Sequence, residues 1–169
     1  MSAKLEPVVS IWALLGGVIL IAIVLVTTLN VGAFTLDRVA RWFGANVSGL
    51  PGYEDFVRLS ISVAALMLFP YCQLKRGHVN VDLFAQHFPL SVQRVLDSLW
   101  LLITAVLALG LAWYMCLGLL EAKSDHVVSP VLGWPEWPFY APGIISLVLW
   151  ALVALSQIAA RPMEEKQHG

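Results

Sequence analysis

The chain has 169 residues, of which 59% are hydrophobic and 12% are charged. Because soluble domains carry about 25% charged residues, this composition leaves too few polar side chains to cover a water-exposed surface. The formal net charge of −1 provides no basic face, so nucleic acid is excluded as a partner.

Long uncharged stretches predict membrane-spanning helices, because a helix needs about 20 largely apolar residues to cross the hydrocarbon core. The chain is uncharged between Glu6 and Asp37, between Asp97 and Glu121, and between Glu136 and Arg161. A shorter apolar stretch gives a further span, so four spans are expected, at about residues 10–31, 53–74, 92–120 and 138–160. The predicted fold class is an all-α membrane protein, with a single four-helix membrane domain over residues 1–169.

The first span differs from a signal peptide in its length and in its C-terminal flank. Its apolar region, Ile11 to Leu29, exceeds the usual length of about 7–15 residues, and no clear small-x-small cleavage site lies after it. We therefore expect this span to remain as a membrane anchor.

The second span has a short uncharged stretch, Leu59 to Leu74. Starting the helix just after Pro51 gives it enough length and places Glu54 and Asp55 in its first turn. Carboxylates suit that position because the helix dipole is positive there. Arg58 lies close enough to pair with either carboxylate, which makes a charge near the membrane boundary tolerable.

The distribution of basic residues predicts the orientation. With four spans, both termini and the segment between spans two and three share one side. That side holds Lys4, Lys75, Arg76, Arg94, Arg161 and Lys166, whereas the other holds Arg38, Arg41 and Lys123, with Arg58 at the boundary. The excess predicts cytoplasmic termini. An aromatic belt is expected at the opposite, periplasmic interface from Trp134, Trp137, Phe139 and Tyr140.

The segment between spans two and three predicts a short interfacial helix at about residues 80–88. Gly77 suits the left-handed position that closes a helix, and Asn80 can cap the next one. The apolar residues Val81, Phe84, Ala85 and Phe88 fall on one face at helical spacing. Pro89 then stops the helix, and the third span begins after it.

No cofactor, metal or catalytic site is expected. His78, His87, His126 and His168 all lie outside the expected spans, which argues against a haem held inside the helices. Cys72 and Cys116 lie toward opposite membrane faces, too far apart for a disulfide.

The spans contain few ionisable residues. A transporter working by itself would be expected to place such residues deep in its spans, yet the long uncharged stretches of spans one, three and four contain none. The pattern indicates a helper or scaffold rather than an enzyme. Small residues at Ala105, Ala108 and Ala112 permit close helix packing, either within the chain or against a partner.

The stretch from Glu54 to Pro89 resembles a signature of one membrane protein family. An acidic opening of the second helix and an Arg within a turn are followed by the run Lys75-Arg76-Gly77-His78-Val79-Asn80-Val81-Asp82. The later run Leu132-Gly133-Trp134-Pro135-Glu136-Trp137-Pro138, with Tyr140, is similar to the family's aromatic entry to helix four. The chain thus resembles the small membrane subunit of TRAP (tripartite ATP-independent periplasmic) transporters, DctQ-type.

The resemblance implies a three-part, sodium-driven symport system in a bacterial inner membrane. A periplasmic substrate-binding protein captures an organic acid such as a dicarboxylate or sugar acid, and a large multi-helix membrane subunit moves it inward. The small subunit, surrounded by the lipid bilayer, enlarges the fixed scaffold of that large subunit. It also offers the binding protein part of a docking surface.

The same resemblance implies roles for individual residues. Glu54, Asp55 and Arg58 are candidate partner-interface or structural residues, with Glu54 and Arg58 pairing with each other or with the large subunit. Arg76, Gly77, His78 and Asp82 would fix the cytoplasmic turn, contacting the partner, lipid headgroups or only one another. Trp134, Trp137 and Tyr140 form a candidate periplasmic interface.

Three other interpretations of the sequence stay open. A self-sufficient homo-oligomeric transporter predicts transport by this chain without a partner. A membrane redox subunit predicts a Soret band on purification, and a purely structural membrane protein predicts neither activity.

Overall fold

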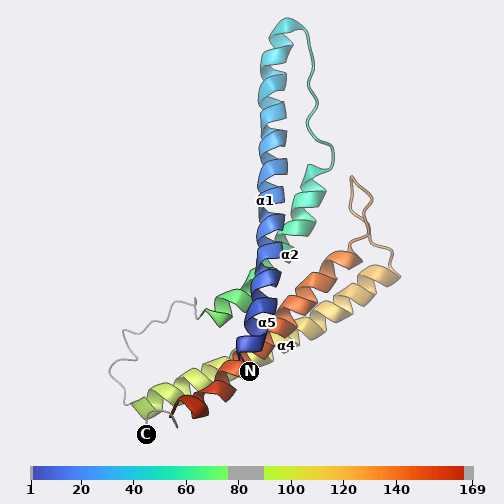
Figure 1. Cartoon of the computed structure of the whole chain (residues 1–169). Coiled ribbons are helices and arrows are strands. Elements are labelled where there is room, and N and C mark those ends of the chain that lie inside the picture. Colours follow the sequence, from blue (N-terminus) through green and yellow to red (C-terminus); the bar gives the residue numbers. More distant parts are fainter. Residues whose placement is uncertain (1, 76–89, 166–169) are drawn as a thin grey trace.

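Helices occupy most of the part of the chain that the computed structural model describes, which is residues 2–75 and 90–165 (Figure 1). They are α1 (Ser2–Ala40), α2 (Tyr53–Leu74), α4 (Leu90–Ser124) and α5 (Tyr140–Glu165), with the short 3-10 helices η1 (Arg41–Phe43) and η2 (Trp137–Phe139). Within these residues, four helices are long and apolar enough to cross a membrane. The expected all-α class with four apolar helices is therefore confirmed. The helix expected at about residues 80–88 lies outside the described residues.

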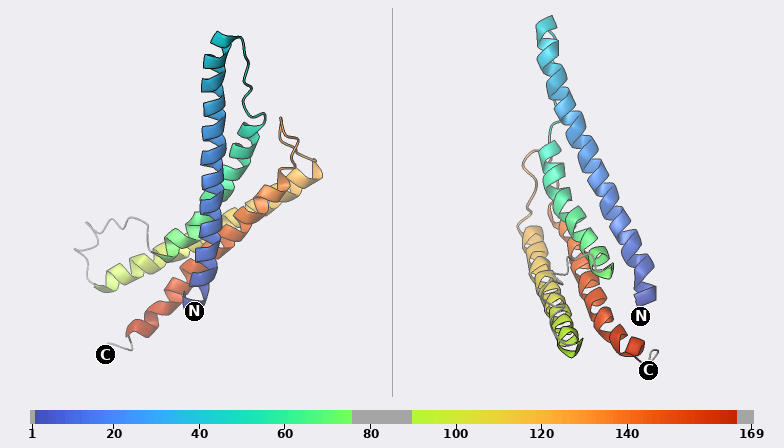
Figure 2. Two further views of the ribbon diagram at one scale, coloured as in Figure 1. Left: turned by 45° about the horizontal axis from the view of Figure 1, so that its top comes forward. Right: turned by 90° about the vertical axis from the view of Figure 1, so that its left-hand side faces the viewer.

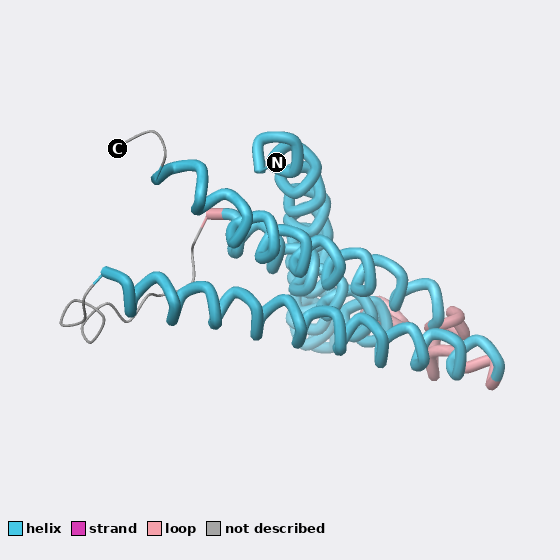
Figure 3. The backbone as a smooth tube through the Cα atoms, turned by 90° about the horizontal axis from the view of Figure 1, so that it is seen from below, coloured by secondary structure: helices cyan, strands magenta, loops and turns pink. Residues whose placement is uncertain are grey.

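The long helices form a row rather than a closed bundle. α1 packs on α2, α2 on α5 and α5 on α4, while α1 and α5 touch over a short stretch. In the right-hand view of Figure 2, α1 and α4 lie on the outer sides with α2 and α5 between them. Seen from below, α4 and α5 run side by side, and the turns that join them gather at one end (Figure 3). Each outer helix therefore leaves a face uncovered by this chain.

Successive helices run in opposite directions. The first turns of α1 and the last turns of α5 lie at the same end of the row (Figure 1). At that end Lys75, which comes directly after α2, pairs with Glu6 of α1. The opposite end, where α2 begins, is called the expected periplasmic end below.

Small residues allow the helices to approach closely. A Cβ on Gly16 of α1 would lie only 2.9 Å from Met67 Cβ of α2, so only glycine permits this crossing distance. Between α4 and α5 the buried cluster is formed by Leu101, Ala105, Ala108, Ala151 and Ala154. Ala112 is buried as well. The sequence allowed Ala105, Ala108 and Ala112 to pack either within the chain or against a partner, and in the structure all three pack within the chain.

α1 is much longer than its expected span. Neither glycine nor proline interrupts the sequence between Gly32 and Gly44, so the helix continues until Gly44 adopts a left-handed conformation with φ of +76°. The chain then returns toward α2 along α1. In this return segment, residues 44–52, the Val47 N–H donates to Asp37 Oδ1 over 2.9 Å. α1 consequently projects past the start of α2 at the expected periplasmic end (Figure 1).

Candidate functional site

The segment between α4 and α5 folds on itself before it meets another helix. The Ser129 N–H donates to the Trp134 carbonyl over 2.8 Å, and Ser129 Oγ accepts the Trp134 N–H over 3.1 Å. The Gly133 N–H closes the turn on the Ser129 carbonyl, with Gly133 at a φ of +64°. Ser129 therefore takes part in three hydrogen bonds within the loop, through its N–H, its carbonyl and its hydroxyl oxygen, and these bonds fix the shape of the loop.

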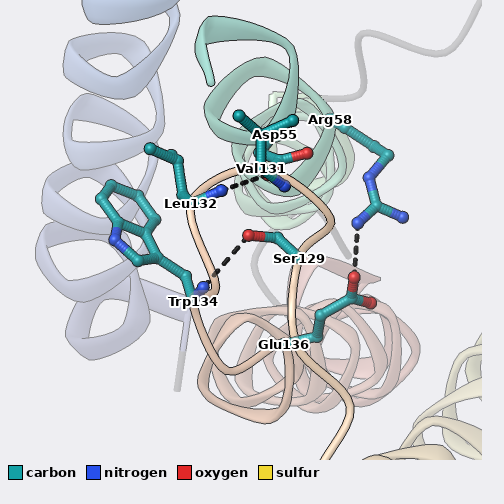
Figure 4. Close-up of polar contacts among 7 residues, drawn as sticks. All are labelled: Asp55, Arg58, Ser129, Val131, Leu132, Trp134 and Glu136. Atoms are coloured by element: carbon teal, nitrogen blue, oxygen red, sulfur yellow. Dashed lines mark hydrogen bonds and ion pairs between the residues drawn. The ribbon is translucent and has the colours of Figure 1, made fainter. Parts of the chain in front are cut away.

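Asp55, in the first turn of α2, holds the tip of that loop. Its Oδ2 accepts the backbone N–H groups of Val131 over 2.8 Å and Leu132 over 2.9 Å (Figure 4). The residue is 4% exposed, so the carboxylate is removed from water and depends on these donors. The glycine before the helix, Gly52, has a φ of +77° and lies against the Leu132 side chain.

Arg58, one turn further along α2, pairs with Glu136 of the loop. Figure 4 shows Arg58 reaching Glu136 on the side of the loop away from the Trp134 indole. The sequence predicted a pair of Arg58 with Glu54 or Asp55, but Asp55 accepts the loop N–H groups and the Glu54 carboxylate accepts the Tyr53 hydroxyl over 3.1 Å. Arg58 reaches across to the loop because Glu136 approaches α2 just before η2 begins. We call Asp55, Arg58, Ser129 and Glu136 the loop clamp.

The expected interface aromatics surround the clamped loop. The rings of Trp134 and Phe139 stack with centroids 6.5 Å apart, and Lys123 Nζ lies 5.4 Å from the Trp137 ring centre. Tyr140 begins α5 and lies against Gly118 of α4. Trp134 and Trp137 stay 42% and 38% exposed, so the loop presents aromatic surface at this end of the row.

The opposite end of α2 carries a second polar contact. Gln73 Nε2 donates to Gln157 Oε1 over 2.8 Å, and Trp150 Nε1 donates to Gln73 Oε1 over 3.2 Å. Beyond it, Lys75 Nζ lies 2.7 Å from Glu6 Oε1, and this hydrogen bond raises the pKa of the Lys75 ammonium above 10.5. The candidate residues Arg76, Gly77, His78 and Asp82 lie outside the described residues.

The polar side chains in these contacts are hydrogen-bonded to other groups of this chain. In the described residues, every buried side-chain nitrogen or oxygen has a hydrogen-bond partner. The same part of the chain contains no group of three His, Cys, Asp or Glu side chains placed to hold a metal. Cys72 and Cys116 are free thiols.

Residues 30–161 match the family model of the DctQ component of tripartite ATP-independent periplasmic transporters. The match covers more than half of the chain. The chain belongs to this family. No curated protein and no solved structure matches it. As a DctQ component it is a small subunit of a transport system, and the matched region contains the whole loop clamp.

Sequence reasoning missed two contributors to the clamp of this DctQ component. In the sequence Glu136 marks the start of an uncharged stretch and belongs to the aromatic run before the fourth span, but it was not paired with Arg58. An acidic residue on the same expected membrane side as Arg58 is nevertheless a natural partner. Ser129 precedes a proline and lies four residues before Gly133, a combination typical of a tight turn. The contact between Gln73 and Gln157 had no signal in the sequence, because it needs α2 and α5 to be adjacent.

Proposed function

We propose that this chain is the scaffold subunit of a sodium-driven, binding-protein-dependent transporter for an organic acid such as a dicarboxylate or sugar acid. It does not bind or move the solute itself. It sits in a bacterial inner membrane with both termini in the cytoplasm. Its partners are the large membrane subunit that carries out transport and the periplasmic substrate-binding protein.

The observation that carries this proposal is that the buried polar side chains within the helices are already hydrogen-bonded inside the chain. A path for sodium or an organic anion needs ionisable or open polar side chains at membrane depth. The stretches Pro7–Leu36 of α1 and Ser98–Leu120 of α4 are uncharged. Buried polar residues such as Asn30 and Gln73 are already hydrogen-bonded inside the chain. A row of helices of this kind supports a moving partner rather than forming a carrier.

The loop clamp gives the scaffold a fixed surface at its expected periplasmic end. Asp55 and Arg58 are satisfied within the chain, so their part in assembly is to order the loop that carries Trp134 and Trp137. An ordered aromatic loop suits a docking surface for the binding protein, since less conformational entropy is lost on contact. At the cytoplasmic end, the run Arg76-Gly77-His78 with Asp82 is proposed to fix the turn after α2 against the partner or lipid headgroups.

Reconstitution in liposomes tests the scaffold role. The chain, the large subunit, or both are reconstituted with an inward sodium gradient, and the binding protein is added with a labelled organic acid. We expect uptake only with both subunits and the binding protein, and loss of uptake when an ionophore collapses the gradient. Uptake by this chain without the large subunit would establish the self-sufficient transporter instead. A Soret band in the purified chain would point to a redox subunit.

A charge swap tests the role of the clamp. Arg58→Glu and Glu136→Arg each leave two like charges facing one another, so each is expected to reduce recovery of the binding protein with the reconstituted pair. The double variant restores opposite charges and is expected to recover most of it. Glu54→Arg, one turn away on the exposed surface, is the control. If neither single variant changes recovery, the clamp has no part in docking.

A further inference from the structure

The outer helices α1 and α4 both leave an apolar face uncovered, but only one of them matches the thickness of a bilayer. The uncharged stretch Ser98–Leu120 of α4 is about 35 Å long at about 1.5 Å per residue. It fits a hydrocarbon core of about 30 Å with a moderate tilt. The free face of α4 is therefore adequately covered by lipid.

The free face of α1 is too long for the same explanation. Its uncharged stretch, Pro7–Leu36, is about 45 Å long, and fitting it into about 30 Å would need a tilt of about 48°. Transmembrane helices tilt by up to about 40°. Lipid therefore cannot cover the whole apolar face of α1.

Contacts with α2 fix which part of α1 lies outside the bilayer. Glu6 pairs with Lys75 at one end of α2, and Asn30 Oδ1 accepts the Leu50 N–H over 2.9 Å just before the other end. Between these contacts α1 runs beside α2, whose 22 residues are about 33 Å long. The part of α1 after Asn30 projects beyond α2, as Figure 1 shows.

The projecting part continues an apolar stripe that begins within the bilayer. The stripe, at least half exposed throughout, consists of Val18, Ile21, Leu25, Leu36, Val39 and Phe43. At about 100° per residue the five residues that belong to α1 lie within an arc of about 60°, and Phe43, at the end of η1, follows about one turn after Val39. The last three residues repeat the sequence spacing of the first three 18 residues later. We call these six residues the α1 stripe.

The charged residues of the projecting part lie off the stripe. Asp37 and Arg41 pair with each other over 2.7 Å, and Asp37 also accepts the Val47 N–H of the return segment. Leu29 and Gly32 lie on the same face between Leu25 and Leu36, so the apolar face continues at the three- and four-residue spacing that pairs one helix with another. Permanent interfaces are apolar in this way, whereas transient ones with soluble partners are about as polar as the surrounding surface.

We propose that the α1 stripe pairs with a transmembrane helix of the large membrane subunit that also extends past the bilayer at the expected periplasmic end. The inference rests on the proposed function, because it takes its partner from there. A membrane-embedded helix can follow the seam on both sides of the membrane boundary, which neither lipid nor a soluble protein can do.

Co-purification of the full chain with the large subunit tests the pairing. In Val39→Glu/Phe43→Glu, both changes lie outside the bilayer, so insertion is unaffected. We expect recovery of the large subunit in mild detergent to fall about tenfold or more. Arg38→Glu is the control: it lies on the same projecting part, off the stripe, and changes the net charge by the same amount. The variant chains should keep the apparent Tm of the unaltered chain.

Cross-linking identifies the occupant of the stripe. In a chain with Cys72→Ser and Cys116→Ser, Val39→Cys is expected to cross-link to the large subunit, and Arg38→Cys much less. Cross-links between two copies of this chain would overturn the proposal in favour of a homodimer. Unchanged recovery of the large subunit with Val39→Glu/Phe43→Glu would place the interface elsewhere and leave the proposed function standing. Failure of the unaltered chain to recover the large subunit would instead remove the proposed function itself.

Discussion

The two ends of α2 are held by different chemistry. At its first turn the buried carboxylate of Asp55 accepts two backbone N–H groups from the loop between α4 and α5. At its last turn Gln73 exchanges neutral hydrogen bonds with Gln157 and Trp150, which belong to a helix already packed beside it. The difference teaches that one end organises a loop, while the other adds specificity to a contact that helix packing provides.

The largest effect is expected from the carboxylate that holds the loop. Asp55→Ala leaves two N–H groups without their acceptor, and such a loss costs about 1–3 kcal/mol per group when the group is buried. We expect a fall of several degrees in apparent Tm in detergent, and faster proteolysis between α4 and α5. Asp55→Asn keeps one acceptor oxygen, so its apparent Tm should lie between those of the unaltered chain and Asp55→Ala. Glu54→Ala, in the same turn but exposed, is the control, and an equal fall there would contradict the assignment.

The next effect concerns the glycine before α2. In Gly52→Ala the new residue keeps a φ of +77° and its Cβ lies 2.5 Å from Leu132 Cγ. Gly44 has nearly the same φ, +76°, with open space around it. Both substitutions carry the left-handed cost of about 1–2 kcal/mol, so the excess for Gly52→Ala measures contact with the clamped loop. Equal falls in apparent Tm would mean that the loop shifts freely away from α2.

A smaller effect is expected at the other end of α2. Gln73→Leu removes two side-chain hydrogen bonds, and such bonds between membrane helices contribute about 0.6 kcal/mol each on average. The expected loss is therefore on the order of 1 kcal/mol. Gln157→Leu should cost less when Gln73 is already Leu, which a double-mutant cycle measures. Additive losses would show that these two amides do not stabilise one another. Cys72→Ser, the exposed neighbour, serves as the control.

The smallest effect is expected at the exposed ion pair. The contact raises the pKa of Lys75 above 10.5 and lowers the pKa of Glu6 below 4.5, so the pair's contribution is complete between these two values. It is lost as pH rises through the folded-state pKa of Lys75, or falls through that of Glu6. The difference in apparent Tm between the unaltered chain and Lys75→Gln should be slight and constant between about pH 6 and 9. Added salt should reduce it further. A difference that grew within this pH range would assign the effect to another titrating group.

The sequence predicted the elements of the site better than their pairing. Uncharged stretches identified the apolar helices, and Glu54, Asp55 and Arg58 were expected together at the start of the second one. The partner of Arg58 was not predictable, because a charge near a helix end has several candidates at similar separation. Glu136 becomes the partner of Arg58 because the loop between α4 and α5, shaped by Ser129 and Gly133, brings Glu136 close to α2.

The sequence by itself determined that this is an all-α membrane protein of the DctQ family with four apolar helices, because charge-free length and a local motif require no tertiary information. The tertiary structure decided that the helices form a row, that α1 projects beyond its neighbours, and that Asp55 and Gln73 face different partners. These features depend on which helices lie side by side. Apolar surface drives helices into the bilayer almost regardless of order, whereas side-chain size and hydrogen-bond geometry select their neighbours.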